Sequence, residues 1–418
     1  MPYIIKNKNM ATAVSNTFSN ITEISSNKIK EIILLCILSA IQFSFLMDFI
    51  LMMPLGPQLI KDLNIDPKYL GYLISSYTLS AALVGFIASF YIDKFDRKKV
   101  LLFVYTGFCI GPFLCAFSPN FEMLLMARIF TGAFGGILTS IIMTILGDSI
   151  PLKRLGRATS YVIAANGAAS VVGVPVGLFL ASKWGWQCPF YVLAIFSFTV
   201  LMVSYFFLPS MKNHLSEYAS PRIENIKKVL KNPDFIWPIV FMSLLTFAGG
   251  FTILPFLSTY LASNVAFSIN DISFLFFLGG LASFIAGPVA GNLIDKFGKQ
   301  NVFLLFNFLS MIPILLVTIY PLDSKIFAFT STTLFFMLST GRHVSGMALI
   351  NSRFTNEQRG QFLSVNSSIQ MLSGTLGTIM AGFILYTEDG LLMNFDVLGI
   401  IAICATIFCI FTAFAIDE

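Results

Sequence analysis

Long apolar runs alternate with short polar segments along almost the whole chain after residue 31. A membrane-spanning helix needs about 20 mostly apolar residues, and about twelve runs reach that length. Lipid offers the backbone no hydrogen-bond partner, so long continuous runs predict helices, whereas a β-barrel would have short alternating segments. The predicted spans are 32–55, 70–92, 99–118, 122–148, 158–182, 188–208, 235–262, 272–294, 301–321, 325–349, 360–386 and 395–415.

Composition points to the same environment. The 418 residues are 56% hydrophobic and 11% charged, and the mean hydropathy is +0.82. Soluble domains carry about 25% charged residues. A water-soluble fold of this size has too little interior to hide so many apolar side chains. We therefore predict an all-α membrane protein.

Charge and cysteine content exclude several classes of function. The net charge of +5 comes from 26 Lys and Arg against 21 Asp and Glu. The basic residues lie in short loops between spans rather than on one face, so we expect no nucleic-acid partner. The six cysteines lack zinc-site spacing, and two histidines do not supply a metal site. Because no nucleophile–base pair is visible either, we expect no metal, no cofactor and no enzymatic activity.

The same basic residues predict the orientation of the spans. If the amino terminus is cytoplasmic, 20 of the 26 Lys and Arg lie on the cytoplasmic side and four on the other, as the positive-inside rule requires. Both termini are then cytoplasmic. Residues 1–31 are polar and lack the apolar core and cleavage site of a signal peptide, so we expect a cytoplasmic tail.

The second half of the chain repeats features of the first. Ile-Asp-Lys-Phe occurs in both 89–101 and 291–303 at an offset of 202, and Pro54 and Pro255 differ by 201. A duplicated membrane unit with a basic loop at the same place in each half is typical of a secondary transporter. The expected units are the tail 1–31, a six-helix bundle over 32–208, a cytoplasmic linker over 209–234 and a second bundle over 235–418.

Asp48 and Arg128 are ionisable residues inside predicted spans, where burial costs at least about 2.5–3.5 kcal/mol and favours a functional role. Asp48 lies about 16 residues into an outward-running span, and Arg128 about 6 residues into an inward-running one. At 1.5 Å per residue both fall in the outer half of the bilayer. We predict that they are partners in a proton switch, in which proton binding and conformational change are linked. The alternative is a static ion pair that joins two helices.

Arg342 and His343 lie in the inner half of the tenth predicted span. Arg342 is a candidate contact for an anionic substrate group, and the alternative is a structural role in which its side chain reaches the interface. His343 is a candidate proton relay.

The repeated loop predicts a cytoplasmic gate. Asp93 and Asp295 end spans, where a carboxylate can meet the amino end of a neighbouring helix. Arg97, Lys98 and Lys299 follow at the expected membrane surface. Simple anchoring of the topology also explains the basic residues, but it explains the repeated aspartate less well.

These loops resemble the signature of the major facilitator superfamily, Gly-x-x-x-Asp-Arg-x-Gly-Arg-Arg/Lys. Asp93, Arg97 and Lys98 match it, while Ser89 stands in place of the first glycine and Asp96 in place of the second. The resemblance covers essentially the whole chain after residue 31.

The second copy keeps both glycines of the signature, as Gly291 and Gly298. Arg128 with Gly132 is similar to the family's Arg-x-x-x-Gly motif, whose arginine is implicated in proton coupling. The fifth span is similar to the antiporter motif in its arabinose-efflux-permease-like form, without the adjacent Gly-Pro pair of the drug antiporters. The matching residues there are Gly173, Pro175 and Gly177.

The resemblance implies two pseudo-symmetric six-helix bundles that work by alternating access around a central cavity. It does not specify the substrate, because members carry sugars, drugs, siderophores and metabolites. We expect a monomeric, proton-coupled exporter of a small organic molecule in a bacterial inner membrane, with the substrate, the proton and the bilayer as partners. The alternative is a proton-coupled uptake symporter of a sugar, siderophore or metabolite. A more remote alternative is a non-transporting membrane sensor, which calls for a sizeable soluble domain.

Overall fold

The computed structural model describes residues 29–88, 91–211, 233–319, 324–354 and 356–417. These residues are almost entirely helical, as predicted. The expected tail 1–31 and linker 209–234 fall largely outside the described residues.

The first half of the chain contains a broken N-terminal helix and five further spans. The N-terminal helix covers Ile29–Leu51. It is followed by α2 (Gly56–Leu63), α3 (Pro67–Ala88), η1 (Ile92–Lys94), α4 (Arg97–Ala116), α5 (Phe121–Ser149), α6 (Leu152–Ala168), the π-helix η2 (Ala169–Gly173), α7 (Val174–Trp184) and α8 (Cys188–Phe207).

The second half has the same kind of organisation and adds a short β-hairpin between its last two helices. Its elements are α10 (Pro233–Thr246), the π-helix η4 (Phe247–Phe251), α11 (Leu254–Asn264), α12 (Ile269–Phe297), α13 (Lys299–Thr318), α14 (Lys325–Arg353), α15 (Asn356–Ile384), β1 (Tyr386–Glu388), β2 (Leu391–Met393) and α16 (Phe395–Asp417).

Every predicted span contains helix, but they do not all have the same character. Among the described residues, nine helices are long and apolar enough to cross a membrane. The other predicted spans correspond to α10 with α11, to α14 and to α15. α14 and α15 have 29 residues each, and they carry many Ser, Thr and Gly residues. Their polar residues suit contacts with other helices, whereas side chains such as Ile326 remain exposed on the outer surface.

Two predicted spans are broken rather than continuous. The N-terminal helix ends at Leu51, and a turn that contains Pro54 precedes α2. In the second half η4 ends at Phe251, and after a turn α11 begins at Leu254 with Pro255 in its first turn. Proline has no N–H to donate and its ring clashes with the preceding turn. The predicted span 32–55 therefore extends past the end of its helix at Leu51, and the predicted span 235–262 contains a break; both features occur at the repeated prolines.

Apolar packing distinguishes the two ends of the molecule. At the end where the N-terminal helix begins, one cluster of buried residues lies wholly within 34–211, and two others lie wholly within 235–416. At the opposite end a single cluster contains residues of both halves, such as Leu51, Ile74 and Phe256. The halves are thus packed together at one end and have separate cores at the other.

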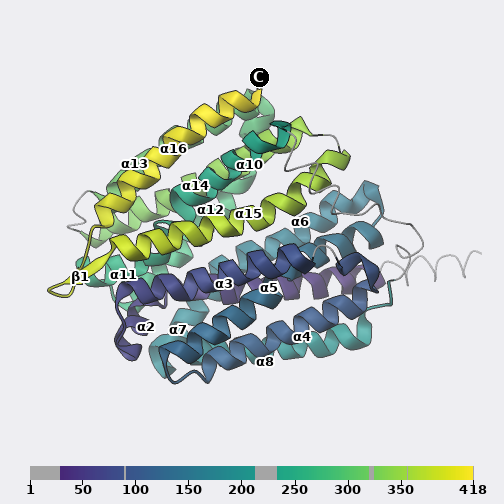
Figure 1. Ribbon diagram of the computed structural model, residues 1–418, viewed down its shortest axis with the longest axis horizontal. Helices are drawn as coiled ribbons and strands as arrows, with labels where there is room; N and C mark the ends of the chain where they lie inside the picture. The colour runs from purple at the N-terminus through teal and green to yellow at the C-terminus, as the bar shows by residue number, and fades with distance from the viewer. Residues whose placement is uncertain (1–28, 89–90, 212–232, 320–323, 355, 418) are drawn as a thin grey trace, which may run out of the picture.

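Three sets of helices join the halves, α3 with α15, η2–α7 with α12, and α2 with α11. α3 and α15 lie side by side across the middle of the molecule (Figure 1). At their crossing a Cβ on Gly71 would lie only 3.2 Å from the carbonyl oxygen of Thr378. A buried hydrogen bond of 2.8 Å joins the hydroxyls of Thr78 and Thr375. The helices meet closely, with polar groups paired inside the contact.

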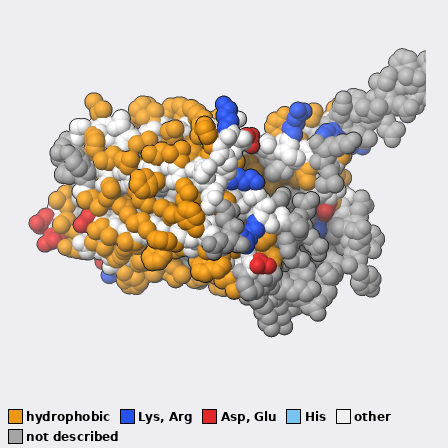
Figure 2. All heavy atoms as spheres, turned by 90° about the horizontal axis from the view of Figure 1, so that it is seen from above, with side chains coloured by type: hydrophobic (Ala, Val, Ile, Leu, Met, Phe, Trp, Pro, Cys, Tyr) orange, Lys and Arg blue, Asp and Glu red, His pale blue; other side chains and the backbone are white. Residues whose placement is uncertain are grey.

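The outer surface of the bundle is apolar. Figure 2 shows hydrophobic side chains over much of the described surface in that view. Large side chains such as Phe103, Phe206 and Ile326 are at least 70% exposed. Contiguous apolar surface of this extent marks contact with lipid, as expected for a membrane protein.

Candidate functional site

The candidate site is centred on a buried ion pair. Asp48 is fully buried in the N-terminal helix, and Arg128 is 1% exposed in α5. Arg128 Nη1 donates a hydrogen bond of 2.9 Å to Asp48 Oδ2. The structure thus brings together the acid and the base that the sequence analysis placed at one depth. The proposed role of the pair in proton coupling stays a prediction.

The pair has unused hydrogen-bonding capacity. Among the described residues, Asp48 Oδ1, Arg128 Nε and the hydroxyl of Tyr77 have no hydrogen-bond partner. A carboxylate oxygen without a partner can take up a proton, since a protonated carboxyl donates where the carboxylate only accepts. Removing the negative charge would leave the guanidinium of Arg128 without its counter-ion in a buried site. Protonation therefore changes the energy of this site strongly.

Tyr77 of α3 completes the site, and the sequence analysis missed it. The guanidinium carbon of Arg128 lies 4.4 Å from the centre of the Tyr77 ring, a cation–π contact. The residue pattern gave no signal for it, because a tyrosine in an apolar run reads as ordinary packing.

Small residues of α5 allow this close arrangement. A Cβ on Gly132 would lie 2.3 Å from the backbone oxygen of Tyr77. A larger residue at this position would push α3 away from α5. Gly132, one helical turn after Arg128, thus keeps the Tyr77 ring within reach of the guanidinium.

An aromatic contact connects the site with the second half of the chain. Phe49, the neighbour of Asp48, lies 5.3 Å from Tyr77 and 5.9 Å from Phe251, measured between ring centroids. Phe251 is the last residue of the π-helix η4. π-Helical segments often occur at functional sites. A shift of the N-terminal helix at Asp48 would therefore move Phe49 and change its packing against η4.

The antiporter-like motif packs against the same helix. A Cβ on Gly173 would lie 2.5 Å from Met47 Sδ, and one on Gly177 would lie 2.7 Å from a methyl carbon of Leu51. Pro175 follows the π-helix η2, and its carbonyl accepts a hydrogen bond of 3.2 Å from Ser273 of α12. The motif thus lies between the Asp48 helix and the second half.

Arg342 and His343 lie apart from this pair and point in different directions. Arg342 is buried, and its Nη1 donates to the hydroxyls of Thr406 at 3.0 Å and Ser310 at 3.4 Å. These contacts place it between α13 and α16, so its side chain does not reach the interface as the structural alternative expected. A contact with an anionic substrate group stays a prediction. His343 is exposed. Adjacent helical residues point about 100° apart, so the two side chains do not form one site.

The first copy of the repeated loop is closely bonded. Arg97 is 5% exposed, and its Nε donates to Asp148 Oδ2 at 3.1 Å. Lys98 lies 5.9 Å from the centre of the Tyr205 ring. The Asp93 side chain lies outside the described part of the structure, although its backbone forms part of η1.

Asp96, which stands where the family signature has glycine, forms hydrogen bonds that the sequence analysis did not predict. It caps α4, because its Oδ1 accepts from the backbone N–H of Lys98 at 3.0 Å. The same carboxylate accepts from Ser210 Oγ at 2.6 Å and from the Met211 N–H at 3.0 Å. The Arg97 N–H donates back to the Met211 carbonyl. Asp96 therefore fixes the end of the first half to the loop.

The second copy has a different local structure. α12 continues through Asp295, which is exposed, as is Lys299 at the start of α13. Gly298 joins the two helices with φ at +82°, a conformation that glycine adopts without strain. Gly291 lies within α12 with nothing near the position of a Cβ. The repeated sequence thus forms a capped loop in one half and a tight glycine turn in the other.

A metal site finds no support in the described part of the chain, where no group of three or more His, Cys, Asp or Glu side chains could hold an ion.

The described residues form a helical membrane architecture with two halves that share a core at one end. A family model, Major Facilitator Superfamily, matches residues 38–260 and 239–418. The chain belongs to this superfamily of transporters, and it is not an enzyme. The predicted family and fold class are confirmed.

Several named proteins and a solved structure are distantly similar to this chain. The putative transporter AraJ of Escherichia coli (strain K12) is 22% identical over 285 residues, which cover 68% of this chain and 71% of AraJ. The quinolone resistance protein NorA of Staphylococcus aureus (strain COL) is 21% identical over 334 residues, which cover 79% and 84%. The crystal structure of a D-xylose–proton symporter superposes with a TM-score of 0.75 at 17% identity and covers 91% of this chain and 97% of the symporter.

Proposed function

We propose that this protein exports a small organic molecule in exchange for protons across a bacterial inner membrane. The observation that carries the proposal is the buried pair of Asp48 and Arg128, joined at 2.9 Å. A carboxylate and a guanidinium held away from water form a site whose energy changes strongly when a proton binds. The naming of NorA as a quinolone resistance protein supports export.

The proposed cycle follows from the packing of the two ends. The shared core holds the outer ends of the halves together, whereas the inner ends have separate cores. Alternating access requires the shared core to part and an inner contact to form. Asp48, Phe49 and Phe251 lie at the edge of the shared contact. In an antiport cycle substrate leaves on the outer side, and Asp48 then takes up a proton from that side, which weakens its contact with Arg128. The proton is released to the cytoplasm after the protein returns to the state in which the outer ends are packed together.

The orientation is part of the proposal. The distribution of Lys and Arg supports a cytoplasmic position for both termini, for the bonded loop at Asp96 and for the separate cores. The proposed domain organisation consists of bundles over 32–208 and 235–418 that are joined by the linker 209–234. We also expect the protein to act as a monomer.

A vesicle assay tests the direction of transport. Everted membrane vesicles that contain the protein are energised so that their lumen becomes acidic, and accumulation of a fluorescent quinolone is followed. Proton-coupled export predicts accumulation that collapses when an ionophore removes the pH gradient. Efflux from preloaded vesicles under the same gradient would instead establish an uptake symporter.

The variant Asp48→Asn tests the coupling within the same assay. We expect loss of gradient-driven accumulation, while exchange of labelled for unlabelled substrate continues, because that exchange needs no net proton movement. Asp66→Asn is the matched control, since Asp66 pairs with Lys68 at 3.4 Å on the exposed surface. Unchanged gradient-driven accumulation by Asp48→Asn would rule out this carboxylate as the coupling group.

A further inference from the structure

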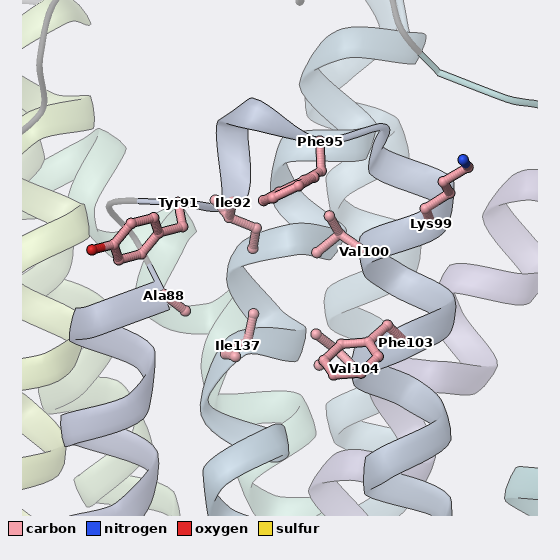
Figure 3. A pocket seen from close by; sticks show the side chains of 9 residues that line it. All are labelled: Ala88, Tyr91, Ile92, Phe95, Lys99, Val100, Phe103, Val104 and Ile137. Atoms are coloured by element: carbon pink, nitrogen blue, oxygen red, sulfur yellow. The ribbon is translucent and has the colours of Figure 1, made fainter.

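A pocket lies away from the candidate site, at the bonded loop of the first half. It has a volume of about 400 Å³ and lies between the end of α3, η1, α4 and α5. Figure 3 shows Ile137 of α5 and Val104 of α4 deep in this space, with Phe95 across its upper part. The volume is in the range of pockets that hold small ligands. Its lining is apolar apart from Lys99 and the hydroxyl of Tyr91.

The pocket adjoins the exposed apolar face of α4. α4 exposes a single stripe of side chains along its whole length, at the spacing of one helix face. Phe103, which is 70% exposed, belongs both to this stripe and to the lining of the pocket. The stripe consists of Lys99, Phe103, Thr106, Ile110, Phe113 and Phe117. A ligand that reaches this pocket along the stripe therefore comes from the bilayer.

Two basic residues, Lys99 and Lys94, lie near the apolar lining of the pocket. Lys99 lies one helical turn, about 6 Å, nearer the start of α4 than Phe103. Lys94 is exposed on η1, with its amine 5.3 Å from the centre of the Tyr91 ring. In the orientation proposed above, the two amines would lie near the cytoplasmic surface of the membrane and the apolar lining of the pocket would lie further into the bilayer. Lysines near an anionic leaflet each contribute to lipid binding, and the effect adds to burial of a chain.

We propose that this pocket binds an anionic phospholipid of the cytoplasmic leaflet. One acyl chain lies against Val100, Val104 and Ile137, and the phosphate lies at Lys99 and Lys94. The choice of leaflet rests on the orientation proposed above, whereas the lipid class rests only on the apolar walls and the two amines. The bound lipid fills the space beside the loop that Asp96 fixes to Met211.

The test uses the full-length protein in nanodiscs of phosphatidylcholine that contain a trace of phospholipid with a photoreactive acyl chain. The probe carries either a phosphatidylglycerol or a phosphatidylcholine headgroup on the same chain. Crosslinks are mapped by mass spectrometry to peptides that contain Val104 or Ile137. This readout does not depend on transport, so it stays informative if the proposed antiport is wrong.

The expected result is selective labelling. Phosphatidylglycerol should label the pocket at least about fivefold more than phosphatidylcholine, the ratio expected for one lysine at a membrane surface. Lys99→Gln should remove most of this preference, and the control Lys183→Gln, at the other end of the bundle, should keep it. Val100→Trp should fill the pocket and abolish labelling, whereas Val192→Trp on the lipid-facing surface of α8 should not.

Two outcomes would overturn the proposal. Equal labelling by the two headgroups, or by a photoreactive fatty alcohol that has no phosphate, would mean that the pocket takes any apolar chain. Undiminished labelling of Val100→Trp, in protein that melts at the wild-type temperature, would mean that the probe lies elsewhere. Lys99→Gln leaves the apolar packing intact and tests the headgroup contact even if Val100→Trp does not fold.

Discussion

The pair of Asp48 and Arg128 should be strongly coupled in stability as well as in transport. Both side chains are at most 1% exposed, and their charged atoms are 2.9 Å apart. Removing one partner of a buried pair leaves an uncompensated charge and costs about 3–5 kcal/mol. Asp48→Asn and Arg128→Gln should each destabilise the protein by about this amount. The double variant leaves two neutral amides, so it should be less destabilised than the sum, by about 2–3 kcal/mol.

The assay is reversible unfolding in mixed micelles, with the free energy of unfolding measured for all four members of the cycle. The exposed pair of Asp66 and Lys68 provides a control cycle, with Asp66→Asn and Lys68→Gln, and should show no measurable coupling. Additive effects of Asp48→Asn and Arg128→Gln, within about 0.5 kcal/mol, would refute the reasoning. They would mean that water or other groups already neutralise the two charges.

Three further predictions follow from other contacts. Tyr77→Phe keeps the ring beside Arg128 and should retain gradient-driven transport, whereas Tyr77→Leu should lose it, and equal activity of the two variants would exclude the ring contact. Asp96→Ala removes the cap of α4 and the hydrogen bond to Met211. If this costs about 1.4 kcal/mol of local stability, hydrogen exchange of the Met211 amide should become about tenfold faster. Unchanged exchange would show that Asp96 does not hold the loop at Met211. Gly71→Leu should clash with the Thr378 carbonyl, which lies 3.2 Å from the position of a Cβ at residue 71. The clash should shift the equilibrium away from the state in which the outer ends are closed, so a cysteine placed at Ser258 should be alkylated faster. Slower or equal alkylation would contradict this prediction.

The sequence predicted the membrane class, the positions of the spans and the internal repeat. These follow from apolar length and from the distribution of basic residues, which lipid constrains directly. It also predicted that Asp48 and Arg128 lie at one depth, because helical rise converts residue number into height.

Other features depend on rotation about helix axes and on local backbone geometry, which apolar length does not specify. The breaks at Pro54 and Pro255 are one case, since many membrane helices continue past a proline. Arg342 and His343 are neighbours in sequence, yet one is buried between α13 and α16 and the other is exposed. The sequence analysis missed Tyr77 because its place in the site depends on contact with the guanidinium of Arg128, which belongs to another helix.

The repeated loop illustrates the same limit. The two copies share Ile-Asp-Lys-Phe, but Gly298 adopts a positive φ that Asp96 does not. Asp96 instead caps a helix and binds Met211, which lies 115 residues later. A long-range bond of this kind leaves no periodic signal in the sequence.

Proton movement driven by substrate alone tests the central claim most directly. Proteoliposomes are loaded with substrate and a pH-sensitive dye and are then diluted into substrate-free buffer at the same pH. Antiport coupled through Asp48 predicts that the lumen acidifies as substrate leaves, and that Asp48→Asn abolishes the acidification while substrate exchange persists. Acidification at the wild-type rate in Asp48→Asn, or a lumen that becomes alkaline in the wild type, would contradict the account.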